Sequence, residues 1–440
     1  MAALVGAAPQ DQAPAPQDRP RLEIALAAAR WIDSQRVETA GGWAWPVDPR
    51  HPDSIARHLY GGTSGVILFL LELHRATADP TWLQRAREGA DELVGARDTS
   101  AAGLWTGLAG QAFVLHETAR ASGEERYEAA ARARLATIRS IVRAEPRGAV
   151  DDQVTDVISG SAGVGLFLLW AAEEMGDGES LELAAAGDWL IAQSEPVELG
   201  PQNSGRNWPM VPGGERCMPN FSHGTAGVAF FLARLAQELG EREDAARYLG
   251  AAIDGAHYLQ SIAVGEEGAL VQHHAPGGED LFYLGWCHGP VGTSRLFELL
   301  ERITGDDAWG PWVERGAHSI LASGIPERPH PGFWNNVGQC CGSAGVASFF
   351  LRLHRGSARP EYLAFAYRLS EDMRARASKE ADGQAMHWPQ AEHRVRPELI
   401  VSQTGYMQGA AGVGLWFLEL DAFETGRPFG LRLPDELPLD

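Results

Sequence analysis

The sequence predicts an all-α protein, an (α/α)7 toroid in which seven outer helices surround seven inner ones. Three observations predict this fold. A short Gly-x-x-Gly motif occurs seven times, an almost wholly apolar stretch follows each motif, and amphipathic stretches lie between them. Repeated helical hairpins build either an open solenoid or a closed ring. Because the first and last repeats look like the middle ones, whereas solenoid ends are atypical, we expect a closed ring.

The glycine motif marks the predicted start of each inner helix. Its second glycine stands at positions 65, 110, 163, 227, 292, 345 and 412. The stretches that follow, such as 66–74 and 164–170, carry few polar residues in their first two turns, which is typical of a helix buried on all sides. Glycine permits tight turns and close backbone approach. Helix–helix packing alone would also explain several of these glycines.

The predicted outer helices carry charged residues along one face, as solvent-facing helices do. They cover residues 21–36, 80–94, 124–144, 180–194, 242–262, 306–323 and 360–379. The segments between helices are rich in tryptophan. These tryptophans either pack the loops over the ring or line a substrate groove, and the sequence leaves both open.

Composition limits the class of partner. The chain has 440 residues, of which 45% are hydrophobic and 22% charged, so it can bury a full core. Acidic residues outnumber basic ones by 58 to 37, and the net charge is -21. A surface of this sign repels phosphate, which argues against nucleic acid and anionic membranes as partners. No apolar run is long enough to insert into a membrane.

The ends of the chain differ in composition from its middle. Residues 1–20 are rich in Ala, Pro and Gln, which predicts a disordered lead, and they lack the features of a signal peptide. We expect one toroid domain over 21–430 and a C-terminal tail over 431–440 that is a surface strap or disordered. Four cysteines in so long a chain form no disulfide framework, so we expect a cytoplasmic protein.

Polar and sulfur-bearing residues gather directly before three of the glycine motifs. His223 precedes the fourth motif, Cys287 and His288 precede the fifth, and Cys340 and Cys341 precede the sixth. If the inner helices of a ring all start at one face, these side chains meet there. Three of the four cysteines then stand in register on neighbouring repeats.

This register predicts a zinc site. Thiolates hold Zn²⁺ at about 2.3 Å, and three protein ligands leave the fourth tetrahedral position open, as in catalytic zinc sites. Two alternatives stay open. The cysteines are small buried residues at tight helix starts, or the site is a closed structural one with His288 or Cys217 as its fourth ligand.

These residues give the chain its resemblance to the lanthionine synthetase C-like family, the cyclases that make the thioether rings of lanthipeptides. Its motifs here are Trp-Cys-x-Gly at 286–289 and Cys-x-Gly at 340–342, and the resemblance extends from about residue 20 to 423. The family fold is an (α/α) toroid with seven inner and seven outer helices. The resemblance implies that Cys287, Cys340 and Cys341 hold Zn²⁺, and Cys341 stands where most members have His, as in a subgroup with an all-cysteine site.

The resemblance also implies the residues that move protons. His223, in a His-Gly motif, matches the acid/base histidine of the family, and Asp156, in Asp-x-x-x-Gly, matches its partner. His288 replaces a frequent Tyr and is a further candidate catalytic residue. Tyr283 replaces a frequent Arg four residues before the first zinc cysteine, and Arg216 is a weak candidate for the missing cation.

Each of these residues has a structural explanation as well. His223 can be a packed residue at a helix start, and Asp156 can be the N-cap of its inner helix. His288 can simply lie near the metal. His273 and His274, in a loop with Pro and Gly, are more typical of a solvated pair than of metal ligands.

The resemblance implies a zinc-dependent cyclase. In this reaction a peptide cysteine thiolate adds to dehydroalanine or dehydrobutyrine, and a general acid protonates the resulting enolate. His223 suits the acid, Asp156 would orient it, and protonated His223 or His288 would offset the charge of three thiolates. The implied partners are a dehydrated precursor peptide and a separate dehydratase, for which this chain has no room.

Three other functions remain in view. An enzyme that adds glutathione or another small thiol to dehydroamino acids would use the same chemistry. A non-catalytic zinc protein could serve as the scaffold of a synthetase complex. A sugar enzyme on the same toroid would need paired carboxylates and would give the three cysteines no role.

Overall fold

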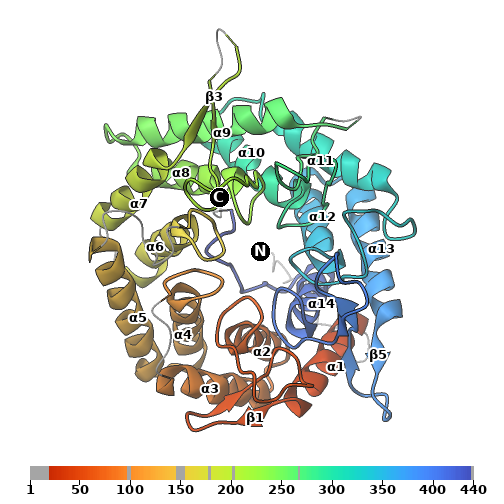
Figure 1. Cartoon of the computed structure of the whole chain (residues 1–440). Coiled ribbons are helices and arrows are strands. Elements are labelled where there is room, and N and C mark those ends of the chain that lie inside the picture. The colour runs from red at the N-terminus through yellow and green to blue at the C-terminus, as the bar shows by residue number, and fades with distance from the viewer. Residues whose placement is uncertain are drawn as a thin grey trace, which may run out of the picture.

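The structure, a computed structural model, describes residues 19–96, 101–144, 154–176, 180–200, 204–265 and 268–437. In this part of the chain, fourteen α-helices form two concentric rings (Figure 1). The inner ring consists of α2 (Thr63–Thr77), α4 (Leu108–Ser122), α6 (Ser161–Met175), α8 (Thr225–Leu239), α10 (Pro290–Thr304), α12 (Ser343–Ser357) and α14 (Ala410–Thr425). The outer ring consists of α1 (Pro20–Ser34), α3 (Pro80–Gly95), α5 (Glu125–Ala144), α7 (Ser180–Ala192), α9 (Ala245–Ile262), α11 (Gly310–Ser323) and α13 (Pro360–Arg376). The predicted all-α (α/α)7 toroid is confirmed.

The ring is closed by contact between its first and last helices. The outer helix α1 packs against α14, and α14 in turn lies beside the first inner helix, α2. Ion pairs reinforce this junction: Arg19 Nε donates to Asp421 at 2.9 Å, and Arg21 lies 3.2 Å from Glu424. The chain is therefore a ring and not an open solenoid.

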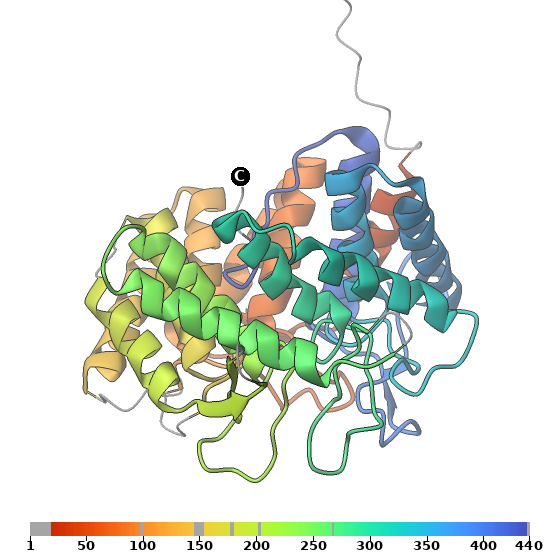
Figure 2. The same cartoon turned by 90° about the horizontal axis from the view of Figure 1, so that it is seen from above.

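The two faces of the toroid differ in the length of their connections. On one face, short turns lead from each inner helix to the next outer one, and several of these helices end with a residue in the left-handed region, such as Gly123 or Ala358. On the other face, longer loops lead back inward (Figure 2). These loops carry four antiparallel hairpins: β1 (Val37–Glu38) with β2 (Trp43–Ala44), β3 (Glu195–Glu198) with β4 (Ser204–Asn207), β5 (Ser378–Lys379) with β6 (Met386–His387), and β7 (Gln390–Ala391) with β8 (Ile400–Val401).

The core lies between the two helical rings and under the loops. Helix α6 is buried without interruption from Ser161 to Ala171, as its apolar sequence predicts. Trp45, Trp105 and Trp208 are fully buried, so these tryptophans pack the loops over the ring. None of the described helices combines the length and the apolar character that a membrane crossing requires.

Hydrogen bonds between loops form a closed circle at the start of the inner helices. They join the residue two positions before each glycine motif to its counterpart in the next repeat, except that Val157 donates in place of Ile158. The seven bonds, all N–H to O=C, are Tyr60 to Trp105 (2.9 Å), Trp105 to Ile158 (2.9 Å), Val157 to Ser222 (3.2 Å), Ser222 to Cys287 (3.0 Å), Cys287 to Cys340 (3.2 Å), Cys340 to Met407 (3.1 Å) and Met407 to Tyr60 (2.7 Å). We call this set the hydrogen-bonded circle.

The second glycine of each motif makes room for this circle. A Cβ atom at Gly292 would overlap the carbonyl oxygen of Trp286, and one at Gly345 would overlap that of Gln339. In all seven motifs the obstructing atom is the carbonyl oxygen six residues earlier. The glycines are therefore needed where the loop folds back onto the first turn of its helix.

The C-terminal tail differs from our expectation. Leu433 is 4% exposed and Asp435 is 1% exposed, so residues 431–437 are not a surface strap. They lie inside the ring (Figure 1). Most of the predicted N-terminal lead, residues 1–18, and the last three residues of the tail, 438–440, lie outside the described residues.

Candidate metal and acid–base site

The three cysteines of the fifth and sixth repeats form one cluster. The Sγ atoms of Cys287 and Cys341 are 3.0 Å apart, and those of Cys341 and Cys340 are 3.4 Å apart. All three side chains are buried, and their sulfur atoms lie within 4.8 Å of one another. The structure thus brings together the residues that the sequence predicted as metal ligands.

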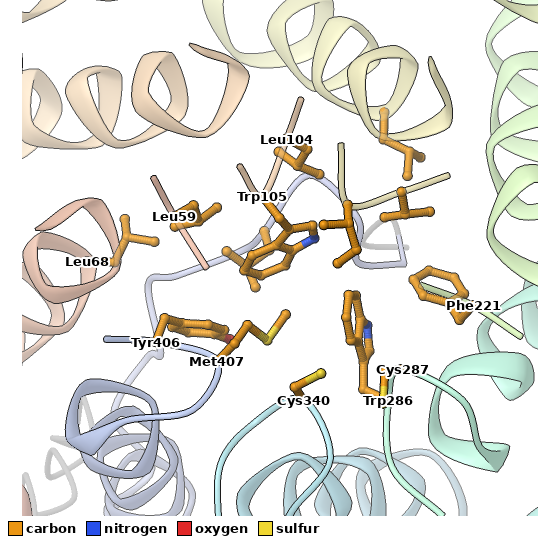
Figure 3. Close-up of a cluster of buried hydrophobic side chains, with 14 of the residues drawn as sticks. Leu59, Leu68, Leu104, Trp105, Phe221, Trp286, Cys287, Cys340, Tyr406 and Met407 are labelled. Carbon is orange, nitrogen blue, oxygen red and sulfur yellow. The ribbon is translucent and has the colours of Figure 1, made fainter. Parts of the chain in front are cut away.

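The hydrogen-bonded circle sets the position of this cluster. Cys287 and Cys340 occupy equivalent places in it, and the amide of one donates to the carbonyl of the other at 3.2 Å. Cys341 is the next residue and is held by the same loop. Figure 3 shows Cys287 and Cys340 on the inner side of the ring, next to Trp286.

The donor set fits a zinc ion with an open position. Tetrahedral Zn²⁺ with Zn–S bonds of about 2.3 Å places its sulfur ligands about 3.8 Å apart, within the range that the cluster spans. Among the described residues, no fourth His, Cys, Asp or Glu joins the three. Cys217 lies elsewhere: the Asn207 side chain donates to its sulfur at 3.1 Å, and its backbone pairs with Ala275. Neither Cys217 nor His288 completes a closed cage.

Without a cation, the three thiols cannot all ionise. The thiols of Cys287 and Cys341 and the hydroxyl of Tyr60 donate to Cys340, and these hydrogen bonds hold the pKa of Cys340 well below its ordinary value. Burial raises the pKa of Cys287. The hydrogen bond from Cys287 favours ionised Cys341, but Cys340 and burial outweigh it and raise the pKa of Cys341. A divalent cation among the three sulfurs would favour their ionised forms, so the cluster suits a metal site.

Tyr60 and Gln408 complete the surroundings of the sulfurs, and neither was predicted from the sequence. The Gln408 side-chain amide donates to the Tyr60 hydroxyl at 3.1 Å and accepts from Asn336 at 2.7 Å. Burial raises the pKa of Tyr60 well above its ordinary value, so the phenol stays protonated and can donate to Cys340. Gln408 holds the place in its repeat that Cys341 holds in the sixth, which was the signal available in the sequence.

The predicted histidine–aspartate pair is present. Nδ1 of His223 lies 2.6 Å from Oδ2 of the fully buried Asp156. The other carboxylate oxygen accepts from the amides of Ser159 and Gly160, both at 2.8 Å. The N-cap of α6 is Gly160, so Asp156 is not the helix N-cap that the sequence also allowed. It holds the loop before α6 through these two amides, and it also orients His223.

The charge of Asp156 also controls the protonation of His223. Burial disfavours the imidazolium, but the hydrogen bond and negative charge of Asp156 outweigh burial and raise the pKa of His223. The side chain stays 27% exposed, so substrate can reach it. Because Nδ1 faces the carboxylate, Nε2 is the atom available for proton transfer.

His288 lies between His223 and His273 in a column of imidazoles. Its ring centroid is 5.5 Å from that of His223 and 3.9 Å from that of His273, on which it stacks. Burial lowers the pKa of His288 well below its ordinary value and that of His273 to about 4. Both rings are therefore neutral near pH 7. We expected His223 or His288 to offset the negative charge of the thiolates, and of these two only His223 can carry the positive charge. His273 is stacked and partly buried, unlike a solvated residue.

Tyr283 contacts both this column of imidazoles and Arg394, a cation from a distant loop. Its ring centroid lies 4.5 Å from that of His273. Burial raises the pKa of Tyr283 to about 12, although a hydrogen bond with Arg394 opposes this. Arg394, in the loop between β7 and β8, therefore supplies the positive charge near Tyr283. Arg216, the weak candidate from the sequence, lies near His273 and His274 instead, and its charge lowers the pKa of both.

Fold and site together define a class of protein: a closed (α/α)7 toroid whose loop face carries a buried three-cysteine cluster beside a His–Asp pair. The family profile described as "Lanthionine synthetase C-like protein" matches residues 54–427. The chain belongs to this family.

A solved structure, that of nisin cyclase, shares the fold. Nisin cyclase matches with a TM-score of 0.62 and 15% sequence identity, over 92% of this chain and 93% of that one. The GH76A α-1,6-mannanase from Salegentibacter sp. HEL1_6 matches with a TM-score of 0.49 and 12% identity, over 92% and 99% of the two chains. Unsaturated glucuronyl hydrolase from Bacillus sp. GL1 matches with a TM-score of 0.46 and 15% identity, over 82% and 96%. No curated protein sequence matches the chain.

Proposed function

We propose that this protein is a zinc-dependent lanthipeptide cyclase. It would join cysteine thiols of a dehydrated peptide to dehydroalanine or dehydrobutyrine and so form lanthionine and methyllanthionine rings. The observation that carries this proposal is the buried cluster of three cysteines next to an accessible His–Asp pair. Membership of the family and the likeness of the fold to that of nisin cyclase support it.

Cys287, Cys340 and Cys341 would hold the zinc ion. Their buried sulfurs have the softness and spacing that the ion prefers, and three ligands leave room for substrate. When bound there, zinc supplies the Lewis acidity that ionises a thiol at neutral pH. Tyr60 donates a hydrogen bond to Cys340 and so spreads the negative charge of the three thiolates.

His223 would act as the general acid. As the sulfur of the peptide bonds to the β-carbon, the π electrons of the double bond move toward the carbonyl and form an enolate. Nε2 of His223 gives its proton to the α-carbon, and the imidazole regains a proton from solvent, which receives the thiol proton. The net reaction adds S–H across C=C. Asp156 keeps the proton on Nδ1 and so holds Nε2 in the role of donor.

The neutral histidines and Tyr283 would position the peptide. Nδ1 of His288 is buried and has no hydrogen-bond partner among the described residues, so a polar group of the substrate that displaces the residues covering it would supply the missing bond. We keep His288 as a catalytic residue on this ground. The Tyr283 hydroxyl, bonded to Arg394, would polarise the carbonyl on which the enolate charge develops.

A dehydrated precursor peptide is the substrate that this chemistry needs. Dehydration of its Ser and Thr residues would fall to a separate dehydratase. We place the reaction in the cytoplasm, where the three thiols stay reduced and able to bind metal.

The test is to incubate the zinc-loaded protein with a dehydrated peptide that contains cysteine, and to count its free thiols. Thiols should disappear at constant peptide mass, and a chelator should stop the loss. The Cys340→Ser variant should be inactive, whereas Cys217→Ser, which changes the one cysteine outside the cluster, should keep wild-type activity.

A second arm separates the alternatives. With glutathione present, an enzyme that uses small thiols would give a peptide heavier by one glutathione in place of a ring. A scaffold would leave the thiol count unchanged, although it bound zinc. Either result would overturn the proposal of a cyclase.

A further inference from the structure

The C-terminal segment crosses the interior of the toroid. We call residues 427–437, which follow α14, the C-terminal strap (Figure 1). It is bonded to inner helices around the ring and not only to its neighbour. These contacts join Arg427 to Glu72 of α2 (2.9 Å), Arg432 to Glu173 of α6 (2.5 Å), Glu436 O to Arg234 of α8 (3.2 Å) and Asp435 to Arg295 of α10 (3.1 Å).

The strap ends in a buried turn directly behind the loop face. The amide of Glu436 donates to the carbonyl of Leu433 at 3.1 Å, and the Leu433 amide donates to the Glu436 carboxylate at 3.2 Å. A cavity of about 450 Å³ lies between the strap, α10, α12 and α14. The same cavity is lined by Trp105, Trp286 and Tyr406, whose side chains Figure 3 shows around the centre of the ring. Of these residues, Trp286 directly precedes Cys287 of the cluster in the chain.

Arg295 connects the strap to Phe221 and, through Phe221, to Trp286. Its Nη1 donates both to the backbone carbonyl of Asp435 at 2.6 Å and to the carboxylate at 3.1 Å. The guanidinium carbon lies 5.2 Å from the centroid of the Phe221 ring, within cation–π range. Phe221 in turn packs edge-on against Trp286, with centroids 5.6 Å apart.

Both aromatic residues stand beside the groups that the proposed chemistry uses. Phe221 comes two residues before His223, and Trp286 comes directly before Cys287. The backbone amide of Ser222, between Phe221 and His223, donates to the carbonyl of Cys287 at 3.0 Å. A displacement of either ring therefore shifts the segment that presents the histidine and the first cysteine.

We propose that Asp435 is a positioning residue of the candidate site: it holds Arg295 against Phe221 and so fixes the backbone that presents His223 and Cys287. This inference rests on the proposed metal site. Asp435 is buried, and Arg295 is the cation that binds it. If the carboxylate is removed, the Arg295 side chain, only 17% exposed, loses its ion-pair partner and has to move or take up water.

The experiment measures how fast the zinc-loaded full-length protein loses its metal to a coloured chelator. The variants are Asp435→Ala, Asp435→Asn and a chain that ends at Gly430. Arg432→Gln is the matched control, because it breaks another strap ion pair, which joins the strap to Glu173 of α6 and leaves the pair of Asp435 and Arg295 in place. Melting temperatures are recorded in parallel, and release is measured well below all of them.

We expect zinc release to be about tenfold faster in Asp435→Ala, the lower end of the effect of residues that support metal ligands. The chain that ends at Gly430 should behave alike, Asp435→Asn should lie between wild type and Asp435→Ala, and Arg432→Gln should stay within about twofold of wild type. Release at the wild-type rate in a folded Asp435→Ala variant would overturn the inference.

Three further outcomes are possible. Faster release in Arg432→Gln, equal to that in Asp435→Ala, would also contradict the inference, because the strap would then act only through general stability. If the wild-type protein binds no zinc, the proposed function fails, and this result is distinct from the failure of the strap. If Asp435→Ala does not fold, Asp435→Asn carries the test.

Discussion

The backbone amide of Cys287 donates a hydrogen bond of 3.2 Å to the carbonyl oxygen of Cys340. The two residues belong to different repeats, and this bond is one of seven that close the hydrogen-bonded circle. The distance between the first and second candidate metal ligands is therefore fixed by the same contact that joins every repeat to the next. The toroid makes the site through its own periodicity, and it needs no special insertion to bring the cysteines together.

The circle predicts a sharp difference between two glycine substitutions. Gly292→Ala should lower the stability by roughly 2 kcal/mol and weaken zinc binding, because its Cβ would overlap the carbonyl oxygen of Trp286 and force the Cys287 loop outward. Gly250→Ala, on the exposed side of α9, has open space around the new Cβ and should stabilise the protein by about 0.5–1 kcal/mol. Thermal unfolding and zinc content measured on both variants check this. Equal behaviour of the two would contradict the role of the circle.

The fold and the cysteine cluster were predictable because both follow the repeat. The seven glycine motifs placed the inner helices, and the predicted outer helices are also found; the largest difference is at α11, which begins at Gly310 instead of residue 306. Cys287 and Cys340 stand at the same place in neighbouring repeats, so the packing of one repeat on the next was enough to bring them together. The sequence also places His223 and Asp156 before adjacent inner helices, and the structure joins them.

Other parts of the site were not predicted from the sequence. They either stand out of register with the cysteines or are residue types that do not indicate a metal site. Tyr60 and Gln408 are in register with the cysteines, but a tyrosine and a glutamine do not by themselves indicate a metal site. Arg394 comes from a hairpin loop whose path no repeat determines. The tail was expected to be a surface strap or disordered, whereas Asp435 is buried against Arg295, which is far away in the sequence.

Substitution of one thiolate tests how the charge of the cluster affects the chemistry. Cys341→His should still bind zinc, since imidazole is a good zinc ligand, but it lowers the negative charge around the ion by one. A bound substrate thiolate is then less nucleophilic, so cyclisation should slow more with dehydrobutyrine, the poorer electrophile, than with dehydroalanine. Rates on matched peptides that contain one or the other residue check this. Kinetics equal to wild type with both peptides would contradict it.

The pair of His223 and Asp156 predicts a shift in the pH profile. Asp156→Asn keeps the oxygen that caps Ser159 and Gly160, but it removes the charge that outweighs burial and raises the pKa of His223. The fraction of His223 that carries the catalytic proton then falls at neutral pH. The alkaline decline of the cyclisation rate should therefore move to lower pH, and the rate near pH 8 should fall by roughly 10²-fold or more, the typical contribution of a general acid.

The same pair contributes to stability with a defined sign. Because the folded protein raises the pKa of His223, the ion pair stabilises fully below the ordinary histidine pKa, and its contribution is lost as the pH rises through the raised value. The melting temperatures of wild type and Asp156→Asn should thus differ more at pH 6 than at pH 9. A difference that grows with pH would show that Asp156 acts on the fold by another route.

Glu436 makes the docking of the strap sensitive to pH. Burial raises its pKa to about 7; Asp435 and Glu419 act in the same direction, whereas Arg295 and the Leu433 amide oppose them. A carboxyl with a raised pKa in the folded protein favours folding most below its ordinary pKa of about 4.3, and this contribution is lost as the pH rises to 7. Wild type and Glu436→Gln should therefore be about equally stable at pH 4, and the glutamine variant should be the more stable at pH 8, because it carries no buried charge. Melting curves at both values check the sign, and proteolysis of the strap at pH 8 should be slower in the variant.

A glutamine variant less stable than wild type at pH 8 would mean that ionised Glu436 attaches the strap through Arg295, so that the ion pair and not burial determines its protonation.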